Sequence, residues 1–193
     1  AVHEHEAATA RRVVGGVQQD APGRAREESP PSELGGCVAD READILGLMQ
    51  RAQALETPAD WLVRSQHNRC LPAGGKLWAK VRAGEALGEI EFLLPARGGQ
   101  AARLVRQRLF ACRAELPNGQ GGLLTVTCVI AQEIGAPKGV KPIEWRLATN
   151  READGFEAVV TLIDWYRARW EIEIFFHVLK NGCRVEALQL GHI

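Results

Sequence analysis

Five side chains capable of acid–base, metal or phosphate chemistry recur at regular spacing near the C-terminal end of the sequence. Tyr166, Arg169, Glu173, His177 and Lys180 follow one another at steps of three, four, four and three residues. In a helix that turns by about 100° per residue, all five fall within an arc of about 80°. One carboxylate set among a phenol and two permanent cations suits the binding of a metal and of phosphate groups. The stripe therefore indicates metal-dependent phosphoryl chemistry.

A solvated helix face would give the same spacing. Ion pairs one turn apart, such as Arg169 with Glu173, are common on exposed helices. The neighbouring arc is apolar and aromatic, which predicts that it packs on the core and leaves the polar stripe partly exposed. That arc consists of Trp165, Ala168, Ile172, Phe175, Phe176 and Leu179. We expect His177 to be a satisfied or exposed histidine rather than a member of a site.

The elements that must position this helix differ along the chain. Residues 1–36 are rich in Pro, Gly, Ser and charge without an apolar period, so we expect an irregular or disordered segment. "GGCVADREADILGLMQRAQAL" predicts a short buried strand running into a helix. The apolar face expected for that helix consists of Ile45, Leu46, Met49 and Ala52.

From residue 60 to 148 the apolar period becomes two, which predicts a mostly antiparallel β segment. The strand-like runs are "DWLVRSQ", "KLWAKVRAG", "GEIEFLL", "ARLVRQRLFACRA", "GLLTVTCVIAQEI" and "IEWRLATN". From Phe156 the helical period returns and holds to Lys180, and Asn181-Gly182 predicts a left-handed stop.

This order predicts an α/β protein with a β-rich insertion in its parent domain. We assign an irregular segment to 1–36, the first part of the parent core to 37–59, the insertion to 60–148 and the rest of the core to 149–193.

Composition excludes several classes of protein. No apolar run approaches the roughly 18 residues of a membrane-spanning helix, so no membrane partner is expected. Lys and Arg total 24 and Asp and Glu total 24, so any contact with nucleic acid must come from local basic patches. The five cysteines are widely spaced and include no CxxC pair, which favours idle thiols in a reducing cytoplasm over a zinc or disulfide framework.

Written as a motif, the stripe is Y-x2-R-x3-E-x6-K, which matches the signature of the insertion-sequence-four family of DDE transposases at all four positions. "VADREADI" closely resembles the family segment around its second catalytic aspartate, which falls on Asp40. Trp145 precedes Tyr166 by 21 positions (166 minus 145), as an aromatic does in that family. "WLVRSQHNR" is similar to the basic strand and loop after the second-aspartate helix.

The resemblance implies a ribonuclease-H-like core in which three carboxylates hold two divalent metals, Mg²⁺ or Mn²⁺. On this sequence it assigns catalytic and metal-binding roles to Asp40 and Glu173. It also implies double-stranded DNA, the terminal inverted repeats of a transposon, as the substrate and a homodimer as the working assembly.

Further roles follow from the resemblance for four side chains. Tyr166, Arg169 and Lys180 are expected to hold phosphates near the cleavage point. Trp145 is expected to stack on a base flipped out of the transposon end. The alternative for Trp145 is a half-buried aromatic of a strand.

A second group of expected DNA contacts lies in the basic strand and loop. Arg64, His67 and Arg69 are expected to touch the DNA backbone or base edges. Asp44, one turn from Asp40, is expected to be solvated or to cap the helix, with a supporting role at the metal site as the alternative.

The sequence departs from the family at its first catalytic aspartate. Asp20, the only aspartate before Asp40, lies in the turn-like context "QQDAPG". We therefore expect an incomplete core and an inactive fragment, without the family's N-terminal DNA-binding and C-terminal dimerisation regions, and regard 1–36 as degenerate or frameshifted. The alternatives are a remnant that only binds DNA or a transposase, and an unrelated α/β protein with a chance stripe.

Overall fold

The structure is a computed structural model that describes residues 11–13, 36–55, 59–96, 101–119 and 121–182. Within these ranges, only the backbone is described for residues 11–13, 170–174 and 177. Most of the segment 1–36, predicted to be irregular or degenerate, lies outside the described residues.

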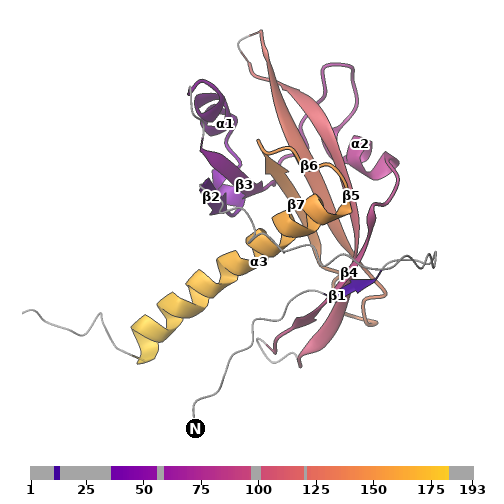
Figure 1. Cartoon of the computed structure of the whole chain (residues 1–193), viewed down its shortest axis with the longest axis vertical. Coiled ribbons are helices and arrows are strands. Elements are labelled where there is room, and N and C mark those ends of the chain that lie inside the picture. The colour runs from indigo at the N-terminus through magenta and orange to yellow at the C-terminus, as the bar shows by residue number, and fades with distance from the viewer. Residues whose placement is uncertain (1–10, 14–35, 56–58, 97–100, 120, 183–193) are drawn as a thin grey trace, which may run out of the picture.

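One sheet of seven strands organises the described chain (Figure 1). Across the sheet the strands are β1 (Arg11–Val13), β4 (Gly88–Leu94), β5 (Arg103–Pro117), β6 (Leu123–Ile134), β7 (Glu144–Thr149), β3 (Asp60–Arg64) and β2 (Gly36–Ala39). Only the edge pair β2–β3 is parallel, and the other neighbours pair antiparallel. This confirms the prediction of a mixed α/β fold whose sheet is mostly antiparallel.

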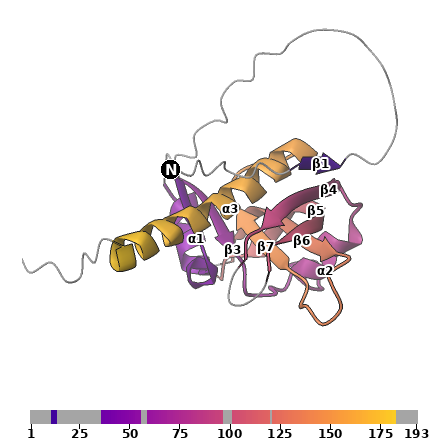
Figure 2. The ribbon, with the colours of Figure 1, turned by 90° about the horizontal axis from the view of Figure 1, so that it is seen from below.

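The helices cover both faces of the sheet. They are the 3₁₀ turn η1 (Arg41–Ala43), α1 (Leu46–Gln53), α2 (Leu77–Ala83), α3 (Phe156–His177) and the π turn η2 (Val178–Gly182). Figure 2 shows α3 on one side of the sheet and α2 on the other. The buried side chains accordingly form two clusters, one beneath α3 and one beneath α1 and α2.

Strand periodicity explains why one sheet serves two cores. Val129 packs in the α3 cluster and its neighbour Ile130 in the α1–α2 cluster. Leu147 and Ala148 divide between the clusters in the same way. Because successive side chains of a strand point to opposite faces, a sheet covered on both sides needs apolar residues at successive positions of its strands.

The run "KLWAKVRAG" was predicted as a strand, and this prediction is wrong, because residues 77–83 form helix α2. Leu77, Trp78 and Val81 are its buried residues, a spacing of one and four that fits one helix face. The intervening Ala, Lys and Arg side chains favour helix as well.

The strand and helix predicted around Asp40 form, but β2 is not buried as expected. Gly36 and Cys37 are exposed, because β2 is an edge strand with β3 on one side only. In α1, Met49 is 1% exposed, whereas Ile45, predicted to belong to the apolar face, is 56% exposed.

The long C-terminal helix is confirmed, but its faces are not distributed as predicted. Phe175 and Phe176, assigned to the core arc, are exposed, whereas Tyr166, assigned to the polar stripe, is fully buried. The reason is that only the first part of α3 lies over the sheet, while its last turns run past the sheet edge (Figure 1). Gly182 ends a π turn without adopting the left-handed conformation predicted for the stop.

The predicted domain boundaries do not coincide with a break in the sheet. β3 and β7, both within the proposed insertion 60–148, join the same sheet as β2 from the proposed core. None of the helices in the described part of the chain is both long and apolar enough to cross a membrane.

Candidate functional site

The two segments that carry the sequence motifs meet at Asp40. Asp40 follows β2 and caps the 3₁₀ turn, where its Oδ1 accepts a hydrogen bond of 2.8 Å from the Arg41 amide. Its Oδ2 accepts a bond of 3.3 Å from Nη2 of Arg169 on α3, 129 positions later in the chain. The end of β2 and the signature helix are therefore in direct contact.

Arg64 brings a second cation to Asp40. In the parallel pair, Ala39 lies opposite Val63. Asp40 and Arg64, the next residues along the chain, therefore lie at the same end of the two strands. The Nη1 atom of Arg64 lies 4.0 Å from Oδ1 of Asp40. Asp40 therefore lies between two guanidinium groups, which are groups that bind phosphate well.

Tyr166 forms the buried floor beside these charges. Its side chain is fully buried, and the Arg169 guanidinium lies 5.7 Å from the centroid of its ring. Burial raises the pKa of the Tyr166 phenol, Asp40 adds to the shift, and the nearby Arg64 and Arg169 guanidinium groups oppose it. Tyr166 is therefore a neutral phenol at pH 7.

Trp145 also lies in the core rather than on a surface. It is 8% exposed, stacks on Phe92 with centroids 5.6 Å apart and meets the Tyr166 ring edge-on at 5.6 Å. A nucleobase reaches this ring only if Trp145 leaves those contacts. The arrangement agrees with the alternative of a packed strand aromatic and does not support the predicted stacking on a flipped base.

Asp44, four residues after Asp40, organises the next loop. Its side chain is completely buried, so the expectation of a solvated residue is wrong. Oδ2 accepts hydrogen bonds from the amides of Gln66 at 2.8 Å and His67 at 3.0 Å and from the Ser65 hydroxyl at 2.9 Å. Oδ1 lies 2.6 Å from Nη1 of Arg69.

The charge of Asp44 is held by these partners. Burial by itself raises the pKa of Asp44. The amide of His67, the charge of Arg69 and the Ser65 hydroxyl lower this pKa by more than burial raises it, so it lies below its ordinary value. A buried carboxylate that accepts several hydrogen bonds and faces a cation stays ionised.

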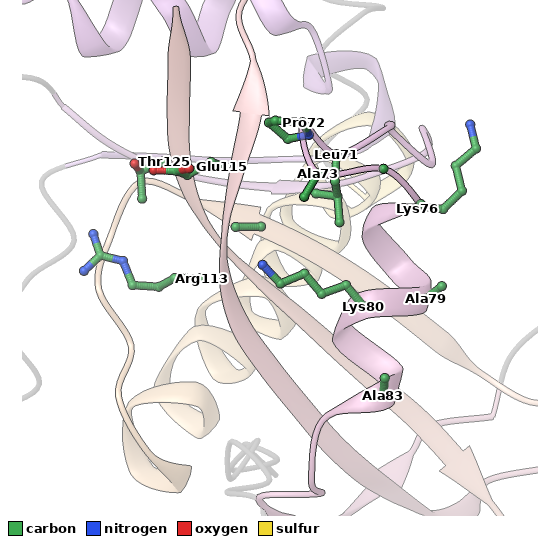
Figure 3. A pocket seen from close by; sticks show the side chains of 13 residues that line it. Leu71, Pro72, Ala73, Lys76, Ala79, Lys80, Ala83, Arg113, Glu115 and Thr125 are labelled. Atoms are coloured by element: carbon green, nitrogen blue, oxygen red, sulfur yellow. The ribbon is translucent and has the colours of Figure 1, made fainter.

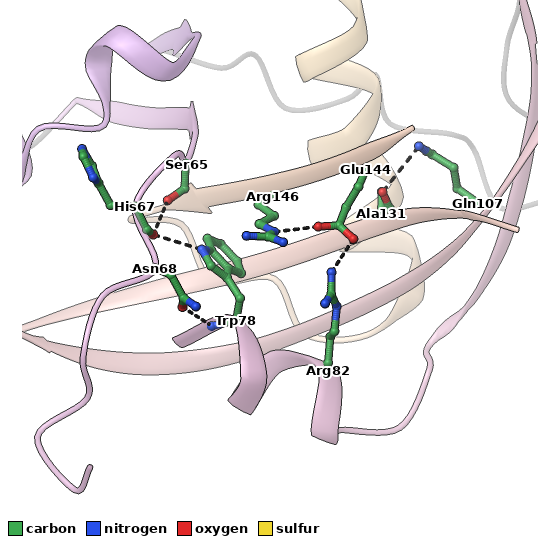
Figure 4. Close-up of polar contacts among 9 residues, drawn as sticks. All are labelled: Ser65, His67, Asn68, Trp78, Arg82, Gln107, Ala131, Glu144 and Arg146. Atoms are coloured by element: carbon green, nitrogen blue, oxygen red, sulfur yellow. Dashed lines mark hydrogen bonds and ion pairs between the residues drawn. The ribbon is translucent and has the colours of Figure 1, made fainter. Parts of the chain in front are cut away.

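This network separates the roles of the three predicted DNA contacts in the loop. Arg69 also donates to the Asp44 carbonyl at 3.0 Å, so its guanidinium supports the loop. The His67 carbonyl accepts a bond of 3.0 Å from Nε1 of Trp78, while the His67 side chain itself is exposed (Figure 4). His67 is exposed, Arg64 is partly buried beside Asp40, and Arg69 is bound to Asp44.

The remaining predicted residues lie further along α3. Glu173 follows Arg169 by one helical turn, so its backbone continues the face that meets Asp40. The side chains of Glu173 and His177 lie outside the described residues. Lys180 is exposed in the π turn.

Residues 23–190 match a family model described as the transposase DDE domain. The chain belongs to this family. Membership implies a ribonuclease-H-like fold and assigns the chain to transposase catalytic domains, which act on DNA and generally use divalent metal ions. The unit β2–α1–β3, whose two strands are parallel, is the part of the sheet with α/β character. The family match begins at residue 23, inside the stretch 1–36.

The donor set that the structure describes does not by itself form a metal site of the kind DDE transposases use. Hard divalent cations need several oxygen ligands. Asp40 supplies one carboxylate, two guanidinium groups approach it, and no group of three His, Cys, Asp or Glu side chains gathers within the described ranges.

Sequence analysis named Asp44 as solvated or capping, with a supporting role as the alternative, and it missed Ser65. Asp44 and Ser65 shape the loop after β3 through contacts 21 positions apart in the chain. The repeated acidic residue in "DREAD" was the available signal for Asp44, whereas Ser65 carried none.

Proposed function

We propose that this chain is part of the catalytic domain of a cut-and-paste DNA transposase of the insertion-sequence-four type, to which the transposon-five transposase belongs. The proposed substrate is the double-stranded terminal inverted repeat of a transposon in the bacterial cytoplasm, and the proposed assembly is a homodimer. The observation that carries the proposal is the Arg169–Asp40 contact, since it joins the two motifs on which the resemblance rests.

The residues divide into two roles in this proposal. Asp40 and Glu173 are the residues that would hold Mg²⁺ or Mn²⁺, and the metal would supply activation of water or a 3′-hydroxyl and stabilisation of the leaving oxygen. Arg64 and Arg169 hold the phosphate next to Asp40. Their planar, permanently charged groups donate several hydrogen bonds to phosphate oxygens.

Other predicted contacts take peripheral positions. His67 is exposed on the loop after β3, and Lys180 lies three turns or so along the helix from Arg169, so we propose that both contact the DNA backbone away from the reacting phosphate. The Arg169 guanidinium lies over the ring of Tyr166, which helps to hold it in place. Trp145 keeps the ring of Tyr166 in place.

One observation favours a second candidate, a chain that binds transposon DNA without cutting it. Two guanidinium groups flank Asp40, an arrangement that suits phosphate binding. In this candidate the chain binds DNA, or another transposase copy, as a remnant of an active enzyme.

Binding is tested by changing the two arginines one at a time to glutamine. We expect Arg64→Gln and Arg169→Gln each to weaken binding of a transposon-end duplex about tenfold, because each removes a charge-assisted hydrogen bond. Arg108→Gln is the matched control, since Arg108 pairs with Glu89 on β5 and β4, which other strands of the sheet separate from β2. Equal effects of all three changes would contradict the proposed site.

Cleavage separates the two candidates. Because a site without the first of its three carboxylates holds divalent metals weakly, we expect the chain alone not to nick a transposon-end duplex in Mg²⁺ or Mn²⁺. Gel analysis of a labelled duplex measures this directly. Mg²⁺-dependent nicking that disappears in Glu173→Gln would establish the enzyme and overturn the binding-only candidate.

A further inference from the structure

Two cysteines from neighbouring strands lie directly opposite each other in the sheet. Cys112 of β5 and Cys128 of β6 are paired residues in the antiparallel register. Paired residues of neighbouring strands place their side chains on the same face of a sheet. Both thiols accordingly belong to the cluster beneath α1 and α2. Neither cysteine belongs to a motif that led to the proposed function, so their juxtaposition needs its own explanation.

The hydrogen bonds of the β5–β6 hairpin show which kind of pair the two cysteines form. At the end of the hairpin, the amide of Asn118 donates to the carbonyl of Gly122 at 3.0 Å. Hydrogen-bonded and non-hydrogen-bonded pairs alternate along antiparallel strands, so every second pair from there, including Cys112–Cys128, is hydrogen-bonded. Pro117, which has no amide proton, falls on a non-hydrogen-bonded pair, as this register requires.

This geometry permits a disulfide, but a strained one. The Cα atoms of a hydrogen-bonded pair are about 5.5 Å apart, which lies within the range that disulfides span. The Cβ atoms of such a pair are also about 5.5 Å apart, farther than the roughly 3.8 Å of an ordinary disulfide. The two strands must therefore approach each other locally when a bond forms between Cys112 and Cys128. Strain of this kind makes a disulfide easier to reduce.

The two thiols differ in their access to solvent. Cys128 is fully buried, whereas Cys112 is partly exposed. A groove of about 780 Å³ lies between α2, the hairpin of residues 71–76 and strands β5 and β6 (Figure 3). Ala114, two positions after Cys112 on the same face of β5, lines this groove, and Figure 3 shows the Lys80 side chain extended across it from α2. A small molecule in the groove therefore lies close to Cys112.

Both thiols are protonated at pH 7. Burial raises the pKa of Cys112, and the ammonium group of Lys80 opposes this rise. Burial also raises the pKa of Cys128, and Cys112 adds to that shift. Because the thiolate is the reactive form of a cysteine, we expect the pair to react slowly with oxidants. The reaction should begin at Cys112, which is the accessible thiol.

We propose that Cys112 and Cys128 form a thiol oxidation site whose oxidant is a low-molecular-weight disulfide of the glutathione type. In the first step, the Cys112 thiolate attacks one sulfur of the oxidant, forms a mixed disulfide and releases one small thiol. In the second step, the Cys128 thiolate attacks the Cys112 sulfur and releases the other small thiol. The two cysteines together lose two electrons and two protons, and the small disulfide is reduced to two thiols.

The position of the two cysteines explains how this reaction acts on the fold. Cys128 needs no access to solvent, because its target sulfur lies opposite it on the neighbouring strand. The new bond joins β5 and β6, the two longest strands, beneath helices α1 and α2. It also restricts the unfolded chain by closing the loop between the two cysteines, which favours the folded state. The site is thus a reversible crosslink in the centre of the sheet.

Peptide mapping tests the bond on the wild-type chain. Trypsin cleaves after Arg113, so the two cysteines fall into different peptides, residues 109–113 and 114–138. The folded chain is incubated with excess oxidised glutathione, alkylated and digested without reductant, and the linked peptides are measured by mass spectrometry. We expect the linked pair to be the main product that contains Cys112. Excess reduced glutathione should lower its amount by about tenfold or more, because the bond is strained.

Two variants separate the steps of the reaction. Cys128→Ala should stop at the mixed disulfide and carry one glutathione on Cys112. Cys112→Ala should form neither the link nor an adduct on Cys128, which is buried. The matched control is Cys37→Ser/Cys70→Ser, which removes two exposed cysteines and should form the link as the wild-type chain does. Circular dichroism checks that each variant is folded before oxidation.

Three results would overturn the inference. If the chain forms the link only after unfolding in urea, the folded sheet keeps the thiols apart. If folded Cys128→Ala takes up no glutathione, Cys112 is inaccessible. If the link resists excess reduced glutathione, it is an ordinary structural disulfide rather than a reversible one. The measurement on the wild-type chain needs no substitution, so it decides the question even if a variant does not fold, and none of these results bears on DNA binding or cleavage.

Discussion

Two aspartates four residues apart have opposite environments. Asp40 lies at the surface between two arginines from distant segments, whereas Asp44 is buried, accepts hydrogen bonds at Oδ2 and pairs with Arg69 through Oδ1. The difference arises because Asp40 stands at the end of an edge strand, while Asp44 lies beneath the loop that follows β3. Asp40 is accessible to a ligand. Asp44 fixes the loop that follows Arg64 and contains His67.

Asp44 should make stability depend on pH in the acid range. Its pKa is lower in the folded than in the unfolded chain, so its stabilising contribution is complete above the ordinary pKa of about 3.9 and is lost as pH falls through the folded value. We expect Asp44→Asn to be about 3 kcal/mol less stable at pH 7, because it leaves Arg69 without its buried partner.

Urea denaturation at several pH values measures this effect. The difference between the wild-type chain and Asp44→Asn should shrink as the pH falls below about 4, near the ordinary pKa of an aspartate. Asp154→Asn, at an exposed position, is the matched control and should behave like the wild type. A constant difference at all pH values would show that Asp44 does not stabilise the fold through its charge.

At the scale of elements, helix α3 combines a buried half and an exposed half. Val159, Leu162 and Ile163 pack on the sheet, whereas Phe175 and Phe176 are more than half exposed and lie against each other with ring centroids 5.9 Å apart. Hydrophobic periodicity identified the helix but not its buried face, since Tyr166 of the predicted polar stripe is buried and Phe175 and Phe176 of the predicted core arc are exposed. It did not reveal where the sheet beneath the helix ends, because that edge is set by strands from other parts of the chain.

Substitutions along α3 should therefore differ in cost by position. Leu162→Ala should destabilise the chain by about 2–5 kcal/mol, as for other fully buried leucines. Phe176→Ala, a larger truncation at a surface position, should change stability by about 0.5 kcal/mol or less. Thermal or urea unfolding of the two variants measures both values, and a comparable loss for Phe176→Ala would mean that the exposed half of α3 is covered.

Helix α2 illustrates a different limit of sequence analysis. "KLWAKVRAG" alternates well enough to suggest a strand, and its seven helical residues are too few for periodicity to decide. The decisive contacts are tertiary, because Leu77, Trp78 and Val81 close the core cluster formed by β5, β6 and α1. A strand at this place would leave that cluster open to water.

For the whole molecule, one sheet supports both hydrophobic clusters. β6 and β7 contribute side chains to each of them, so the two clusters share strands. The proposed division into a parent core and an insertion therefore does not imply two independent folding units. Loss of either cluster exposes the opposite face of the same strands.

We expect a single unfolding transition for the described fold. Leu147→Ala in the α3 cluster and Ile130→Ala in the α1–α2 cluster should each shift the same transition, with a cost of about 2–5 kcal/mol. Tryptophan fluorescence and far-ultraviolet circular dichroism should give coincident curves in urea. Two separated transitions, each shifted by only one variant, would support an independently folding insertion.

The sequence by itself determined the family resemblance, six of the described strands and the long helix. These features depend on local periodicity and on fixed spacing within continuous segments. It also indicated that any contact with DNA must be local, because the positive and negative charges are equal in number.

Only the tertiary structure decided which polar residues face solvent. Trp145 and Tyr166 fitted a DNA-binding pattern but are core residues, and Arg69 is bound to Asp44. Lys76 and Lys80, from the run that was predicted as a strand, line a groove beside helix α2. The physical reason is that burial depends on what other segments place over a side chain. Spacing along one segment carries no information about those partners.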